Sequence, residues 1–446
     1  MGTLIGFFLT FTALVVYFLR PHLLFIFWMV TWPLLCPIFC LVGGLYDAES
    51  TNNFLYTVSE YFAYVYVLII LLRIGKSSRT LFREKNLLKS LFLLCFFFLF
   101  HGFITNFDAQ NIYINIKASI YTLLPMFVMI MDERTRPKHK QLYSVVLLIL
   151  VVEVVFVFLN YMGLRAYIAW YQMVIEFPEG ANLATGTFLG SPRLADYIAT
   201  LFCFLCVDFF SRREIPGWHF LIICTICGIC LLAAGNRMPL AVAVITFGLT
   251  VFLYGKQYKL LLIVLLILGY GGLSWLASYQ GGDITENDGI NRVVNGLTSF
   301  TQSKKDKDDD NSTVRLSEKL IEDYFWKAPV FGNGRACLGQ GAYPITDNVS
   351  DVSDFKADAR LAFMLVEFGV IGLLLYFLVY SNIFKFFLRK TLCVDKKKTI
   401  IIFSFFAIMS ITAGGLWDQN IFPYTYLYFF ALMQMEKEES LTLNNK

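Results

Sequence analysis

Long apolar runs separated by short polar connections make up most of the chain. A helix needs about 20 apolar residues to cross the hydrocarbon core of a bilayer. The pattern therefore predicts an all-α polytopic membrane protein with about 12 to 14 transmembrane helices. We place the spans at residues 2–19, 23–44, 54–72, 87–104, 113–131, 141–162, 192–210, 217–234, 238–255, 258–278, 357–381, 399–416 and 420–434.

One long polar stretch, residues 278–355, interrupts this pattern and is rich in Arg, Asp and Gly. A large water-facing loop on a membrane scaffold is a usual place for function. We divide the chain around it into N-terminal helices (1–162), central helices with a smaller outer loop at 164–191 (163–277), the large loop (278–355), and C-terminal helices with a short tail (356–446).

Lys and Arg predict the orientation, because cytoplasmic loops of membrane proteins carry an excess of them. Alternate connections are basic, which predicts that they face the cytoplasm: 73–89, 132–140, 211–216, 256–259 and 384–398. The large loop, the 164–191 loop and the N-terminus then face outward. We expect a multi-pass membrane protein whose large loop faces the exterior, which in a bacterium is the periplasm or outer surface.

Composition agrees with this class. Of 446 residues, 57% are hydrophobic and 16% are charged, whereas soluble domains carry about 25% charged residues. The net charge of +4 gives no indication of a nucleic-acid partner. Only Cys337 of the 10 cysteines falls in the large loop, so no disulfide framework is predicted there.

Arginines on the predicted outer side are the first candidates for chemistry. Arg193 begins a span, Arg237 lies in a tight turn between two spans, and Arg315 lies in the large loop, followed by Arg335 and Arg360. Guanidinium groups bind phosphates through paired hydrogen bonds and keep their charge. Such a group at this depth suits a lipid-linked diphosphate. Snorkelling or local ion pairs are the alternative.

Two carboxylates of the predicted span at 357–381 are the second set of candidates for chemistry. Asp358 lies at the start of the span predicted at 357–381, where it could act as a base toward a sugar hydroxyl or as a helix cap. Glu367 lies within that span, where an ionisable group normally faces a cavity or a partner. For Glu367 the structural interpretation is favoured.

The sequence offers no recognisable metal or nucleotide motif. It contains no H-E-x-x-H and no Cys/His cluster, and its D-x-D lies in the charged run SKKDKDDDNS, which reads as a solvated loop tip. No Walker loop or dinucleotide fingerprint is present. We therefore expect a metal-independent reaction without a cofactor, in which the donor brings its own leaving group.

Four motifs between residues 186 and 373 together resemble the O-antigen polymerase and ligase superfamily of bacterial membrane glycosyltransferases. They are GTFLGSPRLADYIA, AAGNRMPLAVAV, STVRLSEKLIEDYFWKAPVFGNG and ADARLAFMLVEFGVIGLLLY. The first departs from the family pattern at Ser191 and Arg193, where the family has Asn. The others match the family at Arg237, Arg315, Pro329, Gly332, Gly334, Asp358, Glu367, Gly369 and Gly372.

The resemblance implies a GT-C-like fold and transfer between two lipid-linked glycans. An undecaprenyl-diphosphate glycan would be the donor, and one repeat unit on a second undecaprenyl diphosphate would be the acceptor. Arg237 and Arg315 would hold the donor diphosphate, and Asp358 would activate the acceptor hydroxyl. Candidate substrate-binding residues are Arg193, Arg335, Arg360, Tyr343 and Glu367. Expected partners are membrane lipid, a chain-length-determining protein and a flippase.

Three functions stay open at this point. Ligases of the superfamily carry His where Asp358 stands here, while polymerases tolerate Asp, which favours a polymerase of repeat units. A ligase that moves a finished glycan to lipid A core or another acceptor is the first alternative. A lipid-linked glycan flippase or other transporter is the second, and the clustering of charge in one asymmetric outer loop argues against it.

Overall fold

The computed structural model describes residues 2–31, 61–73, 85–105, 124–161, 184, 186, 191–212, 216–255, 321–322, 324–334, 360–391 and 396–412. Within these ranges the chain is almost wholly helical, and none of them contains a strand. The predicted all-α class is confirmed. The predicted spans at 258–278 and 420–434 lie outside the described residues.

The helices follow the apolar runs of the sequence. They are α1 (Gly2–Leu19), α2 (Leu24–Val30), α6 (Lys85–Thr105), α8 (Leu124–Met131), α9 (His139–Tyr161), α11 (Ser191–Arg212), α12 (Gly217–Ala234), α13 (Arg237–Tyr254), α17 (Arg360–Thr391) and α18 (Lys396–Thr412). A further apolar helix covers Tyr61–Arg73.

Five of the described helices are long and apolar enough to cross a membrane, at Asn86–Ile104, Lys140–Phe158, Leu194–Ser211, Gly217–Ala234 and Met364–Asn382. Together with the shorter apolar helices they make this an integral membrane protein.

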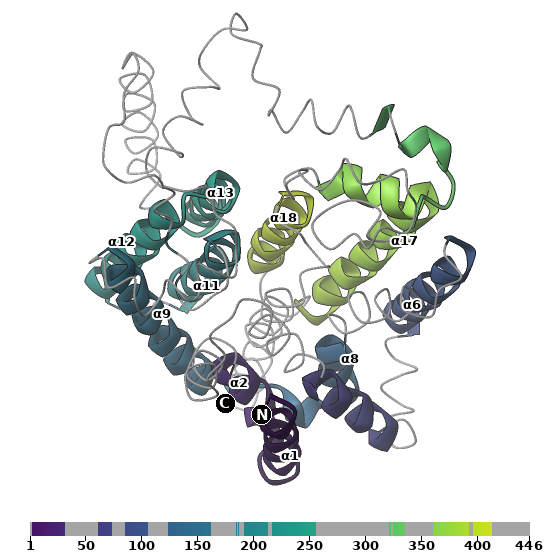
Figure 1. Ribbon diagram of the computed structural model, residues 1–446. Helices are drawn as coiled ribbons and strands as arrows, with labels where there is room; N and C mark the ends of the chain where they lie inside the picture. The colour runs from purple at the N-terminus through teal and green to yellow at the C-terminus, as the bar shows by residue number, and fades with distance from the viewer. Residues whose placement is uncertain are drawn as a thin grey trace, which may run out of the picture.

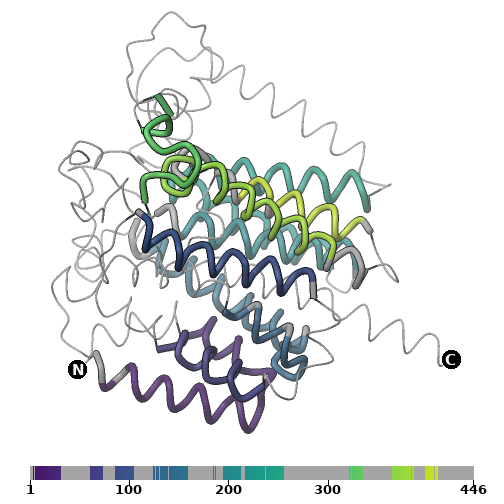
Figure 2. Tube along the Cα trace, turned by 90° about the vertical axis from the view of Figure 1, so that its right-hand side faces the viewer, coloured from purple at the N-terminus to yellow at the C-terminus, as the bar shows by residue number. Residues whose placement is uncertain are grey.

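The helices pack side by side as a bundle (Figures 1 and 2). α11 packs against both α12 and α13, and α18 packs against α13 and α17. On its other side α17 packs against α6. The ends at which α11, α13 and α17 begin lie together on the left of Figure 2, and we call this the outer end, after the predicted orientation.

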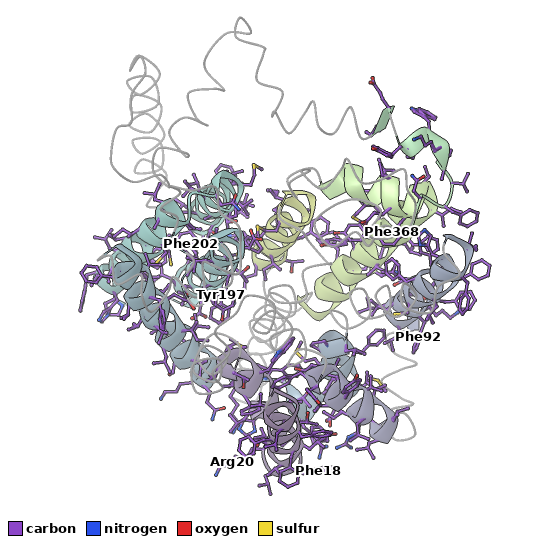
Figure 3. The ribbon with its side chains drawn as sticks, viewed as in Figure 1. Phe18, Arg20, Phe92, Tyr197, Phe202 and Phe368 are labelled. Carbon is purple, nitrogen blue, oxygen red and sulfur yellow. The ribbon has the colours of Figure 1, made fainter. Side chains whose placement is uncertain are left out.

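The core of the bundle is aromatic and aliphatic, and its surface is also apolar. Tyr197 and Phe204 of α11 are fully buried, and Figure 3 shows Tyr197 among the side chains around that helix. Phe7 and Phe11 of α1 and Phe96 of α6 are instead more than 60% exposed. A surface of this kind is expected where the solvent is lipid.

A buried polar cluster joins three helices at the opposite, inner end. Arg73 Nε lies 3.0 Å from Asp132 Oδ2 and donates to Tyr17 Oη over 2.8 Å. Tyr17 Oη donates to the same carboxylate oxygen over 3.0 Å. The residues come from the C-terminal ends of α1 and helix Tyr61–Arg73 and from directly after α8. These three helices therefore run in the same direction.

Basic residues of the α1–α2 turn and of the predicted cytoplasmic connection at 132–140 also meet at the inner end. The pKa of His22 is lowered, first by burial of the ring and then by the charges of Lys138 and Arg20. Arg134, which precedes Lys138 in the 132–140 connection, donates to Asp132 over 2.9 Å. This grouping on one side of the bundle is what the predicted orientation requires, while the side that faces the cytoplasm stays a prediction.

α17 differs from the continuous span predicted at 357–381. The helix extends to Thr391 and is broken at Gly369, which has φ 64° and ψ −169°. Figure 1 shows its two limbs, and the break makes Glu367 part of a helix end rather than of a helix interior.

We predict that Asp132→Ala lowers the free energy of unfolding by about 3 kcal/mol, because it leaves the Arg73 guanidinium without its buried counter-charge. Thermal unfolding in detergent measures this. Ser144→Ala is the control, since the exposed Ser144 hydroxyl donates to the Lys140 carbonyl on its own helix over 2.9 Å. Equal melting temperatures for the two variants would contradict a structural role for the cluster.

Candidate functional site

Three of the predicted site arginines stand near the starts of helices at the outer end. Arg237 is the first residue of α13, Arg360 is the first of α17, and Arg193 is the third of α11. Their side chains lie outside the described part of the structure, as do Arg315, Arg335, Tyr343 and Asp358 altogether. Whether these groups converge on one substrate therefore stays a prediction.

The position of Arg237 follows from a tight turn between α12 and α13. Gly235 adopts the left-handed conformation, with φ 64° and ψ 16°, and its N–H donates to the Leu232 carbonyl over 3.0 Å. Asn236 is extended and precedes the first helical residue. A left-handed glycine after the last turn is a common way to end a helix. It allows α13 to begin at once, with Arg237 in its first turn.

The entry to α11 is held against the neighbouring helices. Ala184 N–H donates to the carbonyl of Ala233, near the end of α12, over 3.0 Å. Gly186 has φ 56°, and a Cβ there would overlap the carboxylate of Glu153 from α9. Glu153 is fully buried. A buried carboxylate thus occupies the space beside the chain that leads to Arg193.

A short segment of the large loop, residues 324–334, crosses the break in α17. The N–H groups of Asn333 and Gly334 donate to the carbonyls of Val366 and Glu367 over 2.8 and 3.1 Å. On the other side of the break, the N–H groups of Val370 and Ile371 donate to the carbonyls of Pro329 and Val330 over 2.9 and 3.2 Å. The segment therefore satisfies both the last carbonyls of one limb and the first N–H groups of the next.

Two glycines make this approach possible. A Cβ on Gly369 would overlap the Val330 carbonyl and lie 2.7 Å from the amide nitrogen of Gly332. A Cβ on Gly332 would overlap the carbonyl of Glu367. Both glycines also have positive φ, 79° at Gly332 and 64° at Gly369, which other residues rarely adopt.

Asn333 reinforces the same contact with its side chain. Its Nδ2 donates to the Val366 carbonyl over 3.1 Å and to the Tyr324 carbonyl over 3.0 Å. The second bond closes the segment on itself. We call residues 329–334 with Val366–Ile371 the loop–helix junction.

His101 of α6 ties a third element to the junction, and the sequence analysis did not select it. Its Nε2 lies 2.6 Å from the Phe331 carbonyl, which it can only approach as a donor. Its ring lies 5.1 Å from that of Phe368, which also packs on Phe98. In the sequence, the feature that could have indicated His101 is its place as a single His near the outer end of the predicted 87–104 span.

Residues 221–377, which contain most of α12, all of α13, the large loop and the outer part of α17, match the family model described as O-antigen ligase. This match supports the resemblance of the chain to the O-antigen polymerase and ligase superfamily. No curated protein matches the chain in sequence. The matched family supports a role in O-antigen or polysaccharide assembly, as a membrane enzyme that acts on lipid-linked glycans.

The O-antigen ligase match includes both halves of the loop–helix junction and three predicted catalytic residues, Arg237, Arg315 and Asp358. His101, Glu153 and Arg193 come from helices outside it. The N-terminal helices of this chain therefore contribute directly to holding the matched region.

Among the described residues, no group of three His, Cys, Asp or Glu side chains is arranged to hold a metal ion. The metal independence of the reaction remains a prediction. Glu367 contributes its backbone carbonyl to the junction and has a half-buried side chain. Its predicted contact with substrate is untested.

We predict that Gly369→Ala and Gly332→Ala each detach the 329–334 segment from α17, because the added methyl groups overlap backbone carbonyls. Hydrogen exchange in nanodiscs should show faster exchange at Asn333, Gly334, Val370 and Ile371, and glycan synthesis should fall.

The matched control is Gly228→Ala, a helical glycine of α12 whose Cβ would meet no atom within 4 Å. Exchange at the junction amides that stays as slow as in the Gly228→Ala protein would refute the arrangement.

Proposed function

We propose that this protein polymerises undecaprenyl-diphosphate-linked repeat units into O-antigen or a related surface polysaccharide at the outer face of the inner membrane. The observation that carries the proposal is the O-antigen ligase match across residues 221–377. Within it the chain has Asp358, and not His, at the place where ligases of the superfamily carry His.

The positions of the arginines support a diphosphate site at the outer end. Arg237 and Arg360 begin two parallel helices, and Arg193 lies in the first turn of a third. The free N–H groups and the dipole of a helix start favour an anion, and a nearby guanidinium adds a full positive charge. Arg237, together with Arg315 of the large loop, is proposed to bind the donor diphosphate.

The proposed reaction needs only groups that the chain and its substrates supply. The acceptor hydroxyl oxygen attacks the anomeric carbon of the donor sugar, and Asp358 takes the hydroxyl proton. The bond between the anomeric carbon and the diphosphate oxygen breaks, and undecaprenyl diphosphate leaves with the electron pair. Arg237 and Arg315 neutralise the charge that develops on this leaving group.

Five further residues are proposed to position the two glycans or their diphosphates: Arg193, Arg335, Arg360, Tyr343 and Glu367. A ligase activity would use the same donor and the same arginines with a different acceptor, lipid A core. The two are separated by a purified enzyme given lipid-linked repeat units alone. A ladder of longer lipid-linked chains identifies a polymerase, whereas a ligase leaves the repeat units unextended. Products formed in detergent exclude a flippase, which makes no covalent bond.

We predict that Arg237→Ala and Arg315→Ala each reduce chain growth about 100-fold or more. Removal of one hydrogen-bond donor that stabilises transition-state charge has an effect of this size in other enzymes. Lys should restore little, because it lacks the paired donors of a guanidinium. Arg20→Ala, at the exposed start of the α1–α2 connection, is the control. Normal polymer length in a correctly inserted Arg315→Ala enzyme would remove that residue from the mechanism.

We predict that Asp358→Asn reduces chain growth about 100-fold or more if the carboxylate is the base. Asn keeps the size of the side chain and its ability to cap a helix, so a purely capping Asp would tolerate the change. Rates with purified lipid-linked repeat units measure the effect. Glu322→Gln, an exposed carboxylate of the same loop, controls for loss of charge. Near-normal activity of Asp358→Asn would place the base elsewhere.

A further inference from the structure

Three large apolar side chains project outward from the segment that crosses the break in α17. Trp326 is 69% exposed, Val330 is 52% exposed and Phe331 is 38% exposed. The backbone carbonyls of Val330 and Phe331 are nonetheless held in place by the hydrogen bonds of the loop–helix junction and of His101. We call these three residues the apolar tip.

The depth of the apolar tip relative to the membrane follows from His101. The Phe331 carbonyl accepts a hydrogen bond from this ring, and His101 lies within the membrane-crossing stretch Asn86–Ile104, three residues before its end. With a rise of 1.5 Å per residue, the contact is about 5 Å below the end of that stretch. Phe331 is thus level with the last turn of α6 and does not stand above it.

The neighbouring surface at this level is one that faces lipid. Phe100 and Phe103 of α6 are each 50% exposed, and Ile104 is 47% exposed. Directly after the break, Val370 of α17 is 41% exposed, and Leu374 one turn further is 62% exposed. The apolar tip therefore continues the outward-facing apolar surfaces of the two helices between which it is fastened.

The side chains around the tip have the composition of a membrane–water boundary. Lys327 Nζ lies 4.9 Å from the centre of the Tyr324 ring, and Phe325 packs edge-on against Trp326 at 5.1 Å. Glu322 is exposed. Trp and Tyr gather at the head-group level of bilayers, and Lys there reaches toward the water.

From this geometry we infer that the apolar tip is an interfacial anchor that inserts into the outer leaflet and contacts phospholipid acyl chains. The anchor would hold the large loop of the enzyme at head-group depth, the level of a lipid-linked diphosphate. The inference of an anchor rests on the loop–helix junction and on the membrane span of α6. It does not depend on whether the enzyme is a polymerase or a ligase.

Site-specific photo-crosslinking tests the anchor without relying on activity. The photoreactive residue p-benzoylphenylalanine is introduced at position 326 or 330 of the full chain, reconstituted in nanodiscs of phosphatidylethanolamine and phosphatidylglycerol. Both native side chains are exposed, so the replacement has room. Position 103, on the outward face of α6, is the lipid-facing control, and position 322 in the same loop is the water-facing control.

We expect positions 326 and 330 to give phospholipid adducts, seen by mass spectrometry, at a yield within about twofold of position 103 and at least about tenfold above position 322. Yields equal to that of position 322 would show a tip in water and overturn the inference. So would crosslinks to a second copy of the chain, or to another part of the same chain, in place of lipid.

Discussion

A membrane span cannot leave backbone hydrogen-bonding groups without partners, and this constraint shapes the outer end of the protein. Gly369 breaks α17 inside a run that is otherwise apolar enough to cross the bilayer. In lipid each unsatisfied N–H or carbonyl costs several kcal/mol, so irregular backbone persists there only where protein covers it. Residues 329–334 supply that cover on both sides of the break. The break therefore needs the segment to satisfy its hydrogen-bonding groups, and the same hydrogen bonds hold the segment in place.

The same constraint ties the N-terminal helices to the matched region. The Phe331 carbonyl is satisfied by His101 of α6, whose ring also packs on Phe368 of α17. α6 and α17 are extensive packing partners, although they lie far apart in the sequence. Consequently the large loop is fastened to two helices, and the span that begins at Arg360 is fixed relative to it.

Helices could be predicted from the sequence because an apolar run of span length has few other stable structures in lipid. The positions of Arg193, Arg237 and Arg360 near helix starts followed from the same runs. The break at Gly369 could not be predicted, since glycines in an apolar span, here Gly369 and Gly372, normally indicate close packing. His101 and Glu153 were missed for a related reason, because one polar residue in an apolar run does not reveal its partner.

The charged residues of the described helices are arranged differently at the two ends of the bundle. At the inner end, Asp132 satisfies Arg73 and Tyr17 within the protein, so the charge of Arg73 is already balanced. At the outer end, Arg193, Arg237 and Arg360 stand at or near helix starts, against the charge bias expected for that side in the predicted orientation. Positive charge at a helix start favours an anion, and this is why we propose that the diphosphate of a lipid-linked glycan binds there.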